Sequence, residues 1–185
     1  MESAKSIREG SKVKGNYKGE LFALLNEKGI LNLYRLRDRT SIFQLNTRSY
    51  LYSLLRFSSD NELFAYQSQE KIYIYSLEDG KLQNTLIARW TKENLENFIF
   101  TSNSEYIAAS YGVKRQSGLS VSAPTYDLTS HGRIRLWNVE DGKMIKTFRG
   151  HRKYTSNLRV NSEKHLLVSY GGDRIIRFWN LPTKD

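Results

Sequence analysis

Repetition along the chain is the sequence feature that most restricts its fold. Four short runs of alternating apolar residues each end in an aromatic residue, and these aromatic residues are Tyr34, Tyr75, Trp137 and Trp179. They lie 41, 62 and 42 residues apart (75−34, 137−75 and 179−137). A period of roughly 40 residues made of short alternating runs predicts a tandem array of small β-sheets. The longer middle interval predicts an insertion of about 20 residues in the third repeat.

A second match between repeats supports this array. Residues 76–88 and 138–150 each combine a strand end, a Glu-Asp-Gly-Lys turn and an alternating strand. Asp-Gly between two alternating runs is a strong signal for a β-hairpin. Twelve Tyr, eight Phe and only two Pro among 185 residues also favour an all-β chain over a helical or disordered one.

The last repeat, residues 150–180, carries the most specific pattern. It begins with Gly150-His151, ends with Phe178-Trp179-Asn180, and places two alternating runs around a turn at 171–173. It resembles one repeat of the WD40 family, with Asn180 where that family usually has Asp. The resemblance covers roughly residues 20–181 and implies β-propeller blades, each a sheet of four antiparallel strands, a to d, counted outward from a central axis.

The resemblance also implies a polar relay inside the last blade. In the family, a His, a Ser, an Asp and a Trp link the strands, and they correspond here to His151, Ser169, Asp173 and Trp179. Such a set satisfies polar groups that are costly to bury alone. A Ser, a His and an Asp also form hydrolase triads, but no nucleophile elbow or oxyanion loop accompanies them. We therefore expect a structural relay and no catalysis.

The expected architecture is an all-β array of about four WD40-type blades, the first incomplete, at residues 20–46, 50–88, 97–149 and 150–185. Residues 1–19 are expected to form a flexible basic segment, with at most an edge strand near Ile7 or Val13. The first blade shows no clear innermost strand, and only residues 6–13 are available as the outermost strand of the last blade. Because family propellers usually have about seven or eight blades, we expect an open arc or partial propeller. It is then a fragment of a longer propeller, or is completed by a second chain or by self-association.

The third repeat carries the insertion. Aligning residues 106–112 with 165–171 matches Ser110 with Ser169, which makes the b–c connection 17 residues longer, (137−110) − (179−169), and places the insertion at 113–130. His131 then stands where the last blade has Asp173. In a meander, b–c and d–a connections emerge at one end, the end that carries His151. Long loops are often functional, so Lys114, Arg115 and Tyr126 are candidate partner contacts, although an unconstrained loop remains the alternative.

Positive charge gives a second clue. The chain has a formal net charge of +10, and the run 142–162 contains no carboxylate. Its basic residues are Lys143, Lys146, Arg149, Arg152, Lys153 and Arg159. Such a run favours an acidic protein surface or RNA as partner, and a solvated outer strand is the alternative. The candidate contacts are Lys146, Arg149, Arg152, Lys153 and Tyr154, whose ring is suited to stacking on a base.

Other classes of function find little support in the sequence. The chain has no Cys, and His131, His151 and His165 lack the spacing of a metal site. No glycine-rich stretch has the form of a phosphate-binding loop, and no apolar run approaches the length of a membrane span. We expect a non-catalytic scaffold for protein–protein interactions, without cofactor or metal, inside the cell in the cytoplasm or nucleus. The alternative is an RNA- or ribonucleoprotein-associated propeller that uses its basic surface.

Overall fold

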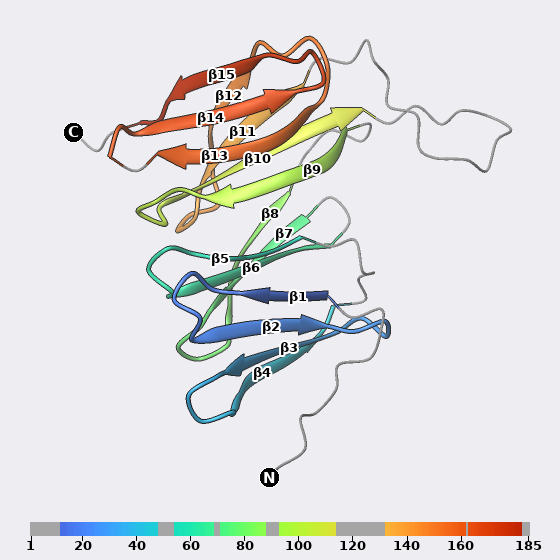
Figure 1. Ribbon diagram of the computed structural model, residues 1–185, viewed down its shortest axis with the longest axis vertical. Coiled ribbons are helices and arrows are strands. Elements are labelled where there is room, and N and C mark those ends of the chain that lie inside the picture. The colour runs from blue at the N-terminus through green and yellow to red at the C-terminus, as the bar shows by residue number, and fades with distance from the viewer. Residues whose placement is uncertain are drawn as a thin grey trace, which may run out of the picture.

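The computed structural model describes residues 12–47, 54–68, 71–87, 93–113, 132–161 and 163–182. Every regular element within these ranges is a β-strand, and the strands form four antiparallel sheets in which each strand pairs with its neighbours in sequence. Figure 1 shows the sheets following one another from the first, at the bottom, to the fourth, at the top. Since the described elements include no helix, none of them is a helix that could cross a membrane.

The four sheets correspond to the four repeats. The first sheet contains β1 (Lys12–Gly15), β2 (Leu21–Leu25), β3 (Ile30–Arg35) and β4 (Ser41–Asn46). The second contains β5 (Leu55–Phe57), β6 (Leu63–Ser68), β7 (Lys71–Ser76) and β8 (Leu82–Ile87). The third contains β9 (Glu93–Phe100), β10 (Tyr106–Val113), β11 (Arg133–Asn138) and β12 (Met144–Arg149). The fourth contains β13 (Thr155–Asn161), β14 (Leu166–Gly171) and β15 (Ile176–Asn180).

The two Glu-Asp-Gly-Lys segments form the predicted hairpin turns. After β11, the side chain of Asn138 accepts the Glu140 amide at 2.8 Å, and the Gly142 amide donates to the Asn138 carbonyl at 3.1 Å. Gly142 has a φ of 67°, a conformation that glycine adopts without steric cost. The turn after β7 has the same form around Ser76 and Gly80, whose φ is 68°. Local sequence therefore determines where these strands reverse.

The first strands of successive sheets lie side by side, β1 beside β5, β5 beside β9 and β9 beside β13. Each sheet packs face to face on the next, and we call the face toward the following sheet the front and the opposite face the rear. Alternation along the strands separates the two faces, because successive side chains point to opposite sides. Among the described residues, no strand pairing joins the fourth sheet back to the first, so the array is an unclosed arc.

Three apolar clusters hold the arc together, one at each junction between sheets. The first junction buries Leu31 and Leu33, and the second buries Ile72 and Ile74. The third buries Ile134, together with Leu136. These side chains are at most 1% exposed, so each of the first three sheets depends on the following sheet to cover its front face.

The predicted equivalence of the four aromatic residues holds in the structure. On the rear face of each sheet the aromatic residue pairs with an apolar residue of the preceding strand. These pairs are Tyr34 with Phe22, Tyr75 with Phe64, Trp137 with Ile107 and Trp179 with Leu167. The conserved register shows that the four repeats have one structural design despite their different sequences.

The structure also differs from three details of the sequence interpretation. The first blade is not incomplete: β1 pairs with β2, Val13 opposite Leu24, and so supplies the inner strand that the pattern did not reveal. For the same reason Lys12 and Val13 do not complete the last blade, and the rest of the stretch 6–13 lies outside the described residues. In the third sheet, Ala109 lies opposite Arg135 as Ser169 lies opposite Arg177 in the fourth. The equivalent of Ser169 is therefore Ala109, not Ser110, and a one-residue slip places Ser110 on the front face.

Candidate functional site

The four residues of the predicted relay lie together at the rear of the fourth sheet. Trp179 Nε1 donates to Ser169 Oγ at 2.8 Å, and Ser169 Oγ lies 2.7 Å from His151 Nε2. The other ring nitrogen, His151 Nδ1, lies 2.9 Å from Asp173 Oδ1. A single assignment of protons satisfies all three contacts: the serine hydroxyl donates to Nε2, and Nδ1–H donates to the carboxylate.

Arg177 joins this relay, which the family pattern did not predict. Its Nη1 donates to Asp173 Oδ2 at 2.8 Å and lies 2.8 Å from His151 Nδ1. Since the Nδ1 proton is committed to Asp173, the guanidinium proton goes to the carboxylate. Asp173 also accepts the backbone amides of Arg152 at 3.0 Å and Ile175 at 3.3 Å. The carboxylate thus fixes both the imidazole and the loop that precedes the fourth sheet.

Burial and hydrogen bonding set the charge states of this pair. Burial lowers the pKa of His151 below its ordinary value of 6.5, and it outweighs the opposite effect of the hydrogen bond and charge of Asp173. Burial would by itself raise the pKa of Asp173, but the hydrogen bonds from His151 and the Arg152 amide lower it well below its ordinary range. The relay therefore consists of a neutral imidazole and an ionised carboxylate near neutral pH.

The arrangement is built for structure rather than for nucleophilic attack. Ser169 is 1% exposed and His151 is fully buried, so the serine oxygen faces the Trp179 indole instead of solvent. A nucleophile must reach a substrate, and this one is covered. Gly171 belongs to the same design, because a Cβ on this residue would lie 2.5 Å from His151 Nδ1.

The second and third sheets fill the same location with different chemistry. At the positions of Ser169, Arg177 and Trp179, the second sheet has Tyr66, Tyr73 and Tyr75. The Tyr66 ring stacks on Tyr73 at 5.1 Å and on Tyr75 at 6.0 Å between ring centroids. The polar relay is thus replaced by a stack of tyrosine rings.

In the third sheet the guanidinium of Arg135 lies over the Tyr111 ring at 4.5 Å, and Tyr111 contacts Trp137 at 5.9 Å between centroids. Only the fourth of these sheets carries the complete relay among the described residues, as the family pattern predicts. His131, proposed at the place of Asp173 in the third repeat, lies outside the described residues.

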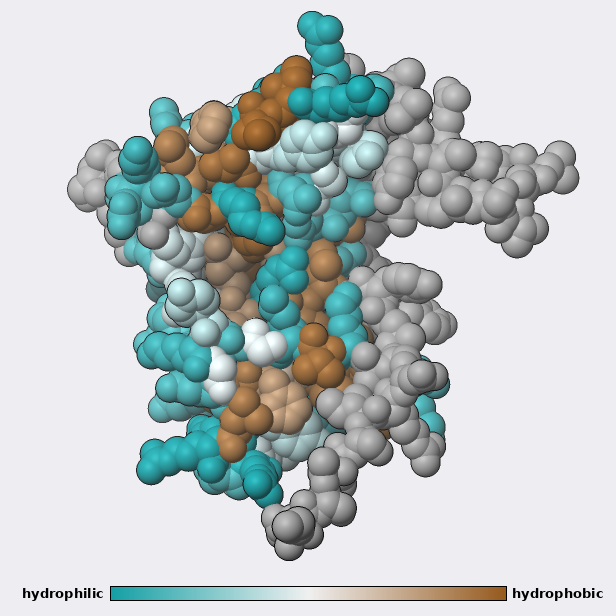
Figure 2. Space-filling model, viewed as in Figure 1, coloured by the Kyte–Doolittle hydropathy of each residue, from teal (hydrophilic) through white to brown (hydrophobic). Residues whose placement is uncertain are grey.

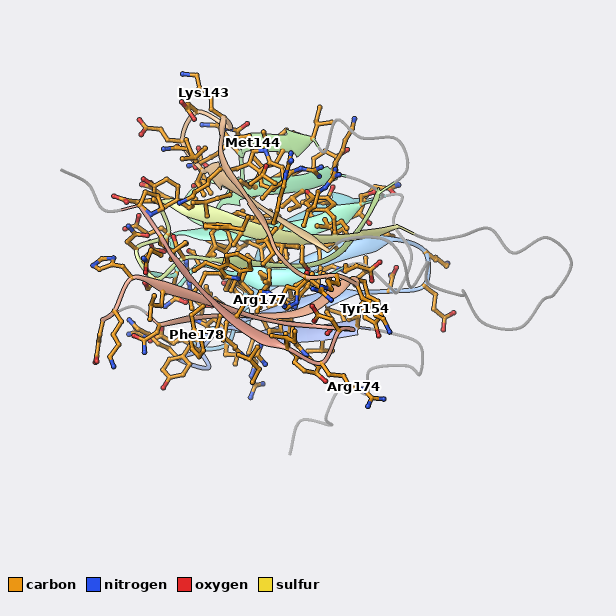
Figure 3. All side chains as sticks on the ribbon, turned by 90° about the horizontal axis from the view of Figure 1, so that it is seen from above. Lys143, Met144, Tyr154, Arg174, Arg177 and Phe178 are labelled. Atoms are coloured by element: carbon orange, nitrogen blue, oxygen red, sulfur yellow. The ribbon has the colours of Figure 1, made fainter. Side chains whose placement is uncertain are left out.

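The loop before the fourth sheet contacts Gly112 and Gly132, which lie on either side of residues 114–131, at one end of the molecule. The Gly132 amide donates to the Lys153 carbonyl at 2.8 Å, and the Gly172 amide donates to the Tyr154 carbonyl at 2.8 Å. A Cβ on Gly112 would lie 3.1 Å from Tyr154 Cβ. Figure 3 shows Tyr154 and Arg174 at this end of the fourth sheet. Gly112, just before the insertion, therefore lies beside Tyr154, and Gly132, just after it, lies beside Lys153.

The structure separates the candidate partner contacts into groups. Arg152, Lys153 and Tyr154 lie in the loop that precedes β13, with Arg152 exposed and the other two half-buried. Lys146 and Arg149 lie on the outer strand β12, where the Lys146 ammonium sits 5.1 Å from the centroid of Phe148. The remaining candidates, Lys114, Arg115 and Tyr126, lie outside the described residues. The basic run is thus not one patch but a loop and an outer strand.

One feature of the molecule was not found by sequence reasoning. At the opposite end, a groove of about 930 Å³ is lined by carboxylates from three repeats: Glu20, Asp60, Glu62, Glu78, Glu105 and Glu140. They are scattered along the chain, so no local pattern revealed them. The front face of the fourth sheet is also uncovered, as expected for the last blade of an open arc. Among the described residues, no three His, Cys, Asp or Glu side chains are placed to hold a metal ion.

Comparison with curated proteins gives partial matches. Nuclear distribution protein nudF 1 of Talaromyces marneffei is 30% identical over 95 residues, which are 51% of this chain and 20% of that protein. Protein GFS12 of Arabidopsis thaliana is 32% identical over 94 residues, 50% of this chain and 6% of its own length. Nuclear distribution protein PAC1-2 of Uncinocarpus reesii is 34% identical over 50 residues, 27% of this chain and 11% of its own length. The chain thus spans a fifth or less of these relatives, and no protein-family model matches it.

Solved structures match the fold over nearly the whole chain. The β-propeller domain of Cps50 (Swd1) from Myceliophteria thermophila has a TM-score of 0.69 at 15% identity, covering 92% of this chain and 53% of that one. The computationally designed protein Ika4 has a TM-score of 0.66 at 10% identity and covers 97% of this chain and 96% of its own. At such identities the likeness concerns the fold alone, and that fold is the propeller arrangement of sheets described above.

Proposed function

We propose that this chain, an array of WD40-type β-propeller blades, acts as a non-catalytic scaffold that binds other proteins and assembles them into complexes. The observation that carries this proposal is the meeting of the loop 150–154 with both ends of the 113–132 connection. A rigid set of sheets here presents loops at one end, and loops held by a rigid framework are where binding residues concentrate. The relay beneath, centred on His151 and Asp173, fixes the backbone of Arg152.

The partner that suits this end is an acidic protein surface. Arg152 is exposed beside Lys153, and the candidates Lys114 and Arg115 follow Gly112 closely in sequence. Tyr154 packs against Gly172, where a Cβ would lie 2.5 Å from the ring. Its ring is therefore held in place, as an aromatic contact at an interface needs to be.

Affinity purification from the native cell, followed by mass spectrometry, tests the proposal. The chain should recover a reproducible set of proteins, and Arg152→Glu with Lys153→Glu should lose them. Lys164→Glu is the matched control, because Lys164 is an exposed lysine of the same sheet in the turn at the other end. Retention of every partner by the Arg152/Lys153 variant would argue against this end of the molecule as the docking site.

RNA binding is the second candidate, and the net charge of +10 favours it. Ultraviolet crosslinking should then capture RNA at residues 143–159, and binding should persist at physiological salt. Loss of binding below that salt concentration would indicate generic charge attraction. Because the described sheets form an unclosed arc, we also include self-association, or completion of the ring by another chain, among the interactions of this scaffold.

A further inference from the structure

The front face of the fourth sheet has the composition of a buried junction but is open to solvent. Ile176 and Phe178 on β15 stand where Ile134 and Leu136 stand on β11, since each pair precedes the aromatic residue of its repeat. Ile134 is 1% exposed and Leu136 is fully buried, whereas Ile176 is 58% and Phe178 is 66% exposed. Figure 2 shows hydrophobic side chains at the surface over this sheet, and Figure 3 labels Phe178 on it.

A polar side chain on the same face repeats a contact made inside the arc. Arg56 on β5 donates through Nη1 to the carbonyl of the preceding residue, Leu55, at 2.9 Å. Arg159 on β13 does the same, donating through Nη1 to the Leu158 carbonyl at 2.8 Å. The two arginines also occupy the same register, Arg56 opposite Ala65 and Arg159 opposite Val168.

The two arginines differ in what they meet beyond their own sheet. Arg56 reaches the inner strand of the following sheet, where Nε donates to the Phe98 carbonyl at 3.1 Å and Nη2 donates to Asn97 Oδ1 at 2.9 Å. Among the described residues, Nε and Nη2 of Arg159 meet no acceptor. Arg159 thus holds the same local geometry and lacks the inner strand that Arg56 contacts.

The rear face of the first sheet has the matching composition. Phe22 and Tyr34 stack with their ring centroids 4.9 Å apart. They occupy the positions that Leu167 and Trp179 occupy on the fourth sheet, whose rear face covers the third sheet. Both rings are half-buried, and so is Leu24 beside them. On the inner strand, the pairing of Val13 with Leu24 matches the pairing of Phe98 with Ala109 in the third sheet. The Val13 carbonyl therefore corresponds to the Phe98 carbonyl, which accepts a hydrogen bond from Arg56 Nε.

We propose that the front face of the fourth sheet binds the rear face of the first sheet of a second copy of this chain. Ile176 and Phe178 then pack on Phe22, Leu24 and Tyr34, and Arg159 Nε donates to the Val13 carbonyl of the other copy. Such an interface is heterologous, joining two different surfaces, and it generates a closed ring or a longer chain of copies. The inference rests on the proposed scaffold function and specifies one of its partners.

One position in the predicted interface is imperfect and gives a sharp test. Lys12, which pairs with Leu25 in the first sheet, occupies the position that Asn97, which pairs with Ser110, occupies in the third sheet. The first sheet therefore has a lysine where the third sheet offers Arg56 an amide oxygen. Arg159 therefore gains one hydrogen bond there instead of two. Lys12→Asn should supply the missing oxygen and tighten self-association by about 10- to 150-fold, the range expected for one hydrogen bond to a charged group.

Sedimentation velocity on the purified chain is the primary measurement. When the protein concentration reaches roughly 100 μM, the measured mass should exceed that of a monomer. This concentration is a generous limit, because well-packed interfaces reach micromolar affinity or better. Phe178→Asp should reduce the chain to a monomer. Leu82→Asp should leave self-association unchanged. Leu82 on β8 is 50% exposed and lies outside the proposed interface, so it is a matched apolar control. Circular dichroism should show the same fold in both variants.

A mixing experiment identifies which surfaces meet. Phe178→Asp leaves the rear face intact, and Leu24→Asp leaves the front face intact, so each variant alone should be monomeric. A mixture of the two should form a dimer and nothing larger, because only one intact junction is available. A wild-type chain that stays monomeric, or a Phe178→Asp chain that associates like the control, would overturn the inference. If the chain is monomeric and the Arg152/Lys153 variant still loses its partners, the scaffold proposal stands alone.

Discussion

At the scale of single residues, the buried relay makes the fold sensitive to acid. Unfolded histidine binds a proton near its ordinary pKa of 6.5, while the pKa of His151 in the folded protein is lower. Between those two values the unfolded state binds more protons, so the free energy of unfolding falls as the pH is lowered. Asp173 acts in the same direction at lower pH, because its folded pKa lies below its ordinary value of 3.8.

Urea unfolding between pH 8 and pH 4 should therefore show a loss of stability that begins as the pH falls below about 6.5. His151→Gln should be less stable at pH 8 and should lose less stability between pH 6.5 and the folded pKa, because the titrating group is gone. An unchanged pH profile in the variant would show that the proton is taken up elsewhere.

Two buried serines provide a matched test of the relay. Ser169→Ala removes the group that meets both His151 Nε2 and Trp179 Nε1, so we expect a cost of about 1–3 kcal/mol in the free energy of unfolding. Ser110 is also fully buried but makes only a 3.4 Å contact with the Asn97 carbonyl on the front face of its sheet. Ser110→Ala should cost less than about 1 kcal/mol. Equal costs would contradict the register that separates these serines.

At the scale of elements, side chains from one inner strand fasten the next. Arg56 links β5 to β9, and Asn97 Nδ2 on β9 approaches the Ser156 carbonyl on β13 at 3.5 Å. Near the turns at the other end, Asn16 Nδ2 donates to Asn61 Oδ1 at 3.0 Å, which joins the first sheet to the second. Apolar packing brings the sheets together, and these polar contacts set their relative positions.

Arg56→Gln should therefore destabilise the chain by about 1.5–3 kcal/mol, since two hydrogen bonds from a charged group across a junction are lost. Arg159→Gln makes the same chemical change at the same register on the uncovered face. In dilute solution it should leave stability unchanged or raise it by less than about 0.5 kcal/mol, because it removes a positive charge that lowers the pKa of Arg56 and so opposes the charged form of that side chain. Chemical unfolding of both variants, well below any association threshold, measures the difference. Similar losses in the free energy of unfolding would mean that the hydrogen bonds from Arg56 to β9 contribute little to stability.

At the scale of the whole molecule, the arc behaves as a row of sheets that each contact only their neighbours, so stability should vary along the row. The second and third sheets are covered on both faces by their neighbours, whereas the fourth exposes Ile176 and Phe178. Hydrogen exchange followed by mass spectrometry should show faster exchange in β14 and β15 than in β10 and β11. Equal protection in a monomeric sample would imply a single cooperative unit. Slower exchange in the fourth sheet at high concentration is expected if a second copy covers it.

Much of this molecule follows from sequence because its repeats are local. The alternating runs, the Asp-Gly turns and the spacing of Tyr34, Tyr75, Trp137 and Trp179 predicted the sheets and their order, because turn chemistry and strand alternation act over a few residues. The relay around His151 was implied by the resemblance of the last repeat to the WD40 family. The sequence prediction failed for β1, which has only four residues and therefore gives little pattern. It also failed for the register of Ser110, because a shift of one residue moves the side chain to the other face while the alternating pattern still looks plausible.

The sequence alone determined that the chain forms small antiparallel sheets in tandem, because apolar alternation and tight turns specify a sheet one hairpin at a time. Only the tertiary structure decided which faces are covered, that Arg177 joins the relay, and that Arg159 repeats the geometry of Arg56 without its acceptors. The carboxylates from Glu20 to Glu140 also converge on one groove only after the sheets pack. These properties depend on contacts between residues tens of positions apart, and burial is a property of the neighbour as much as of the residue itself.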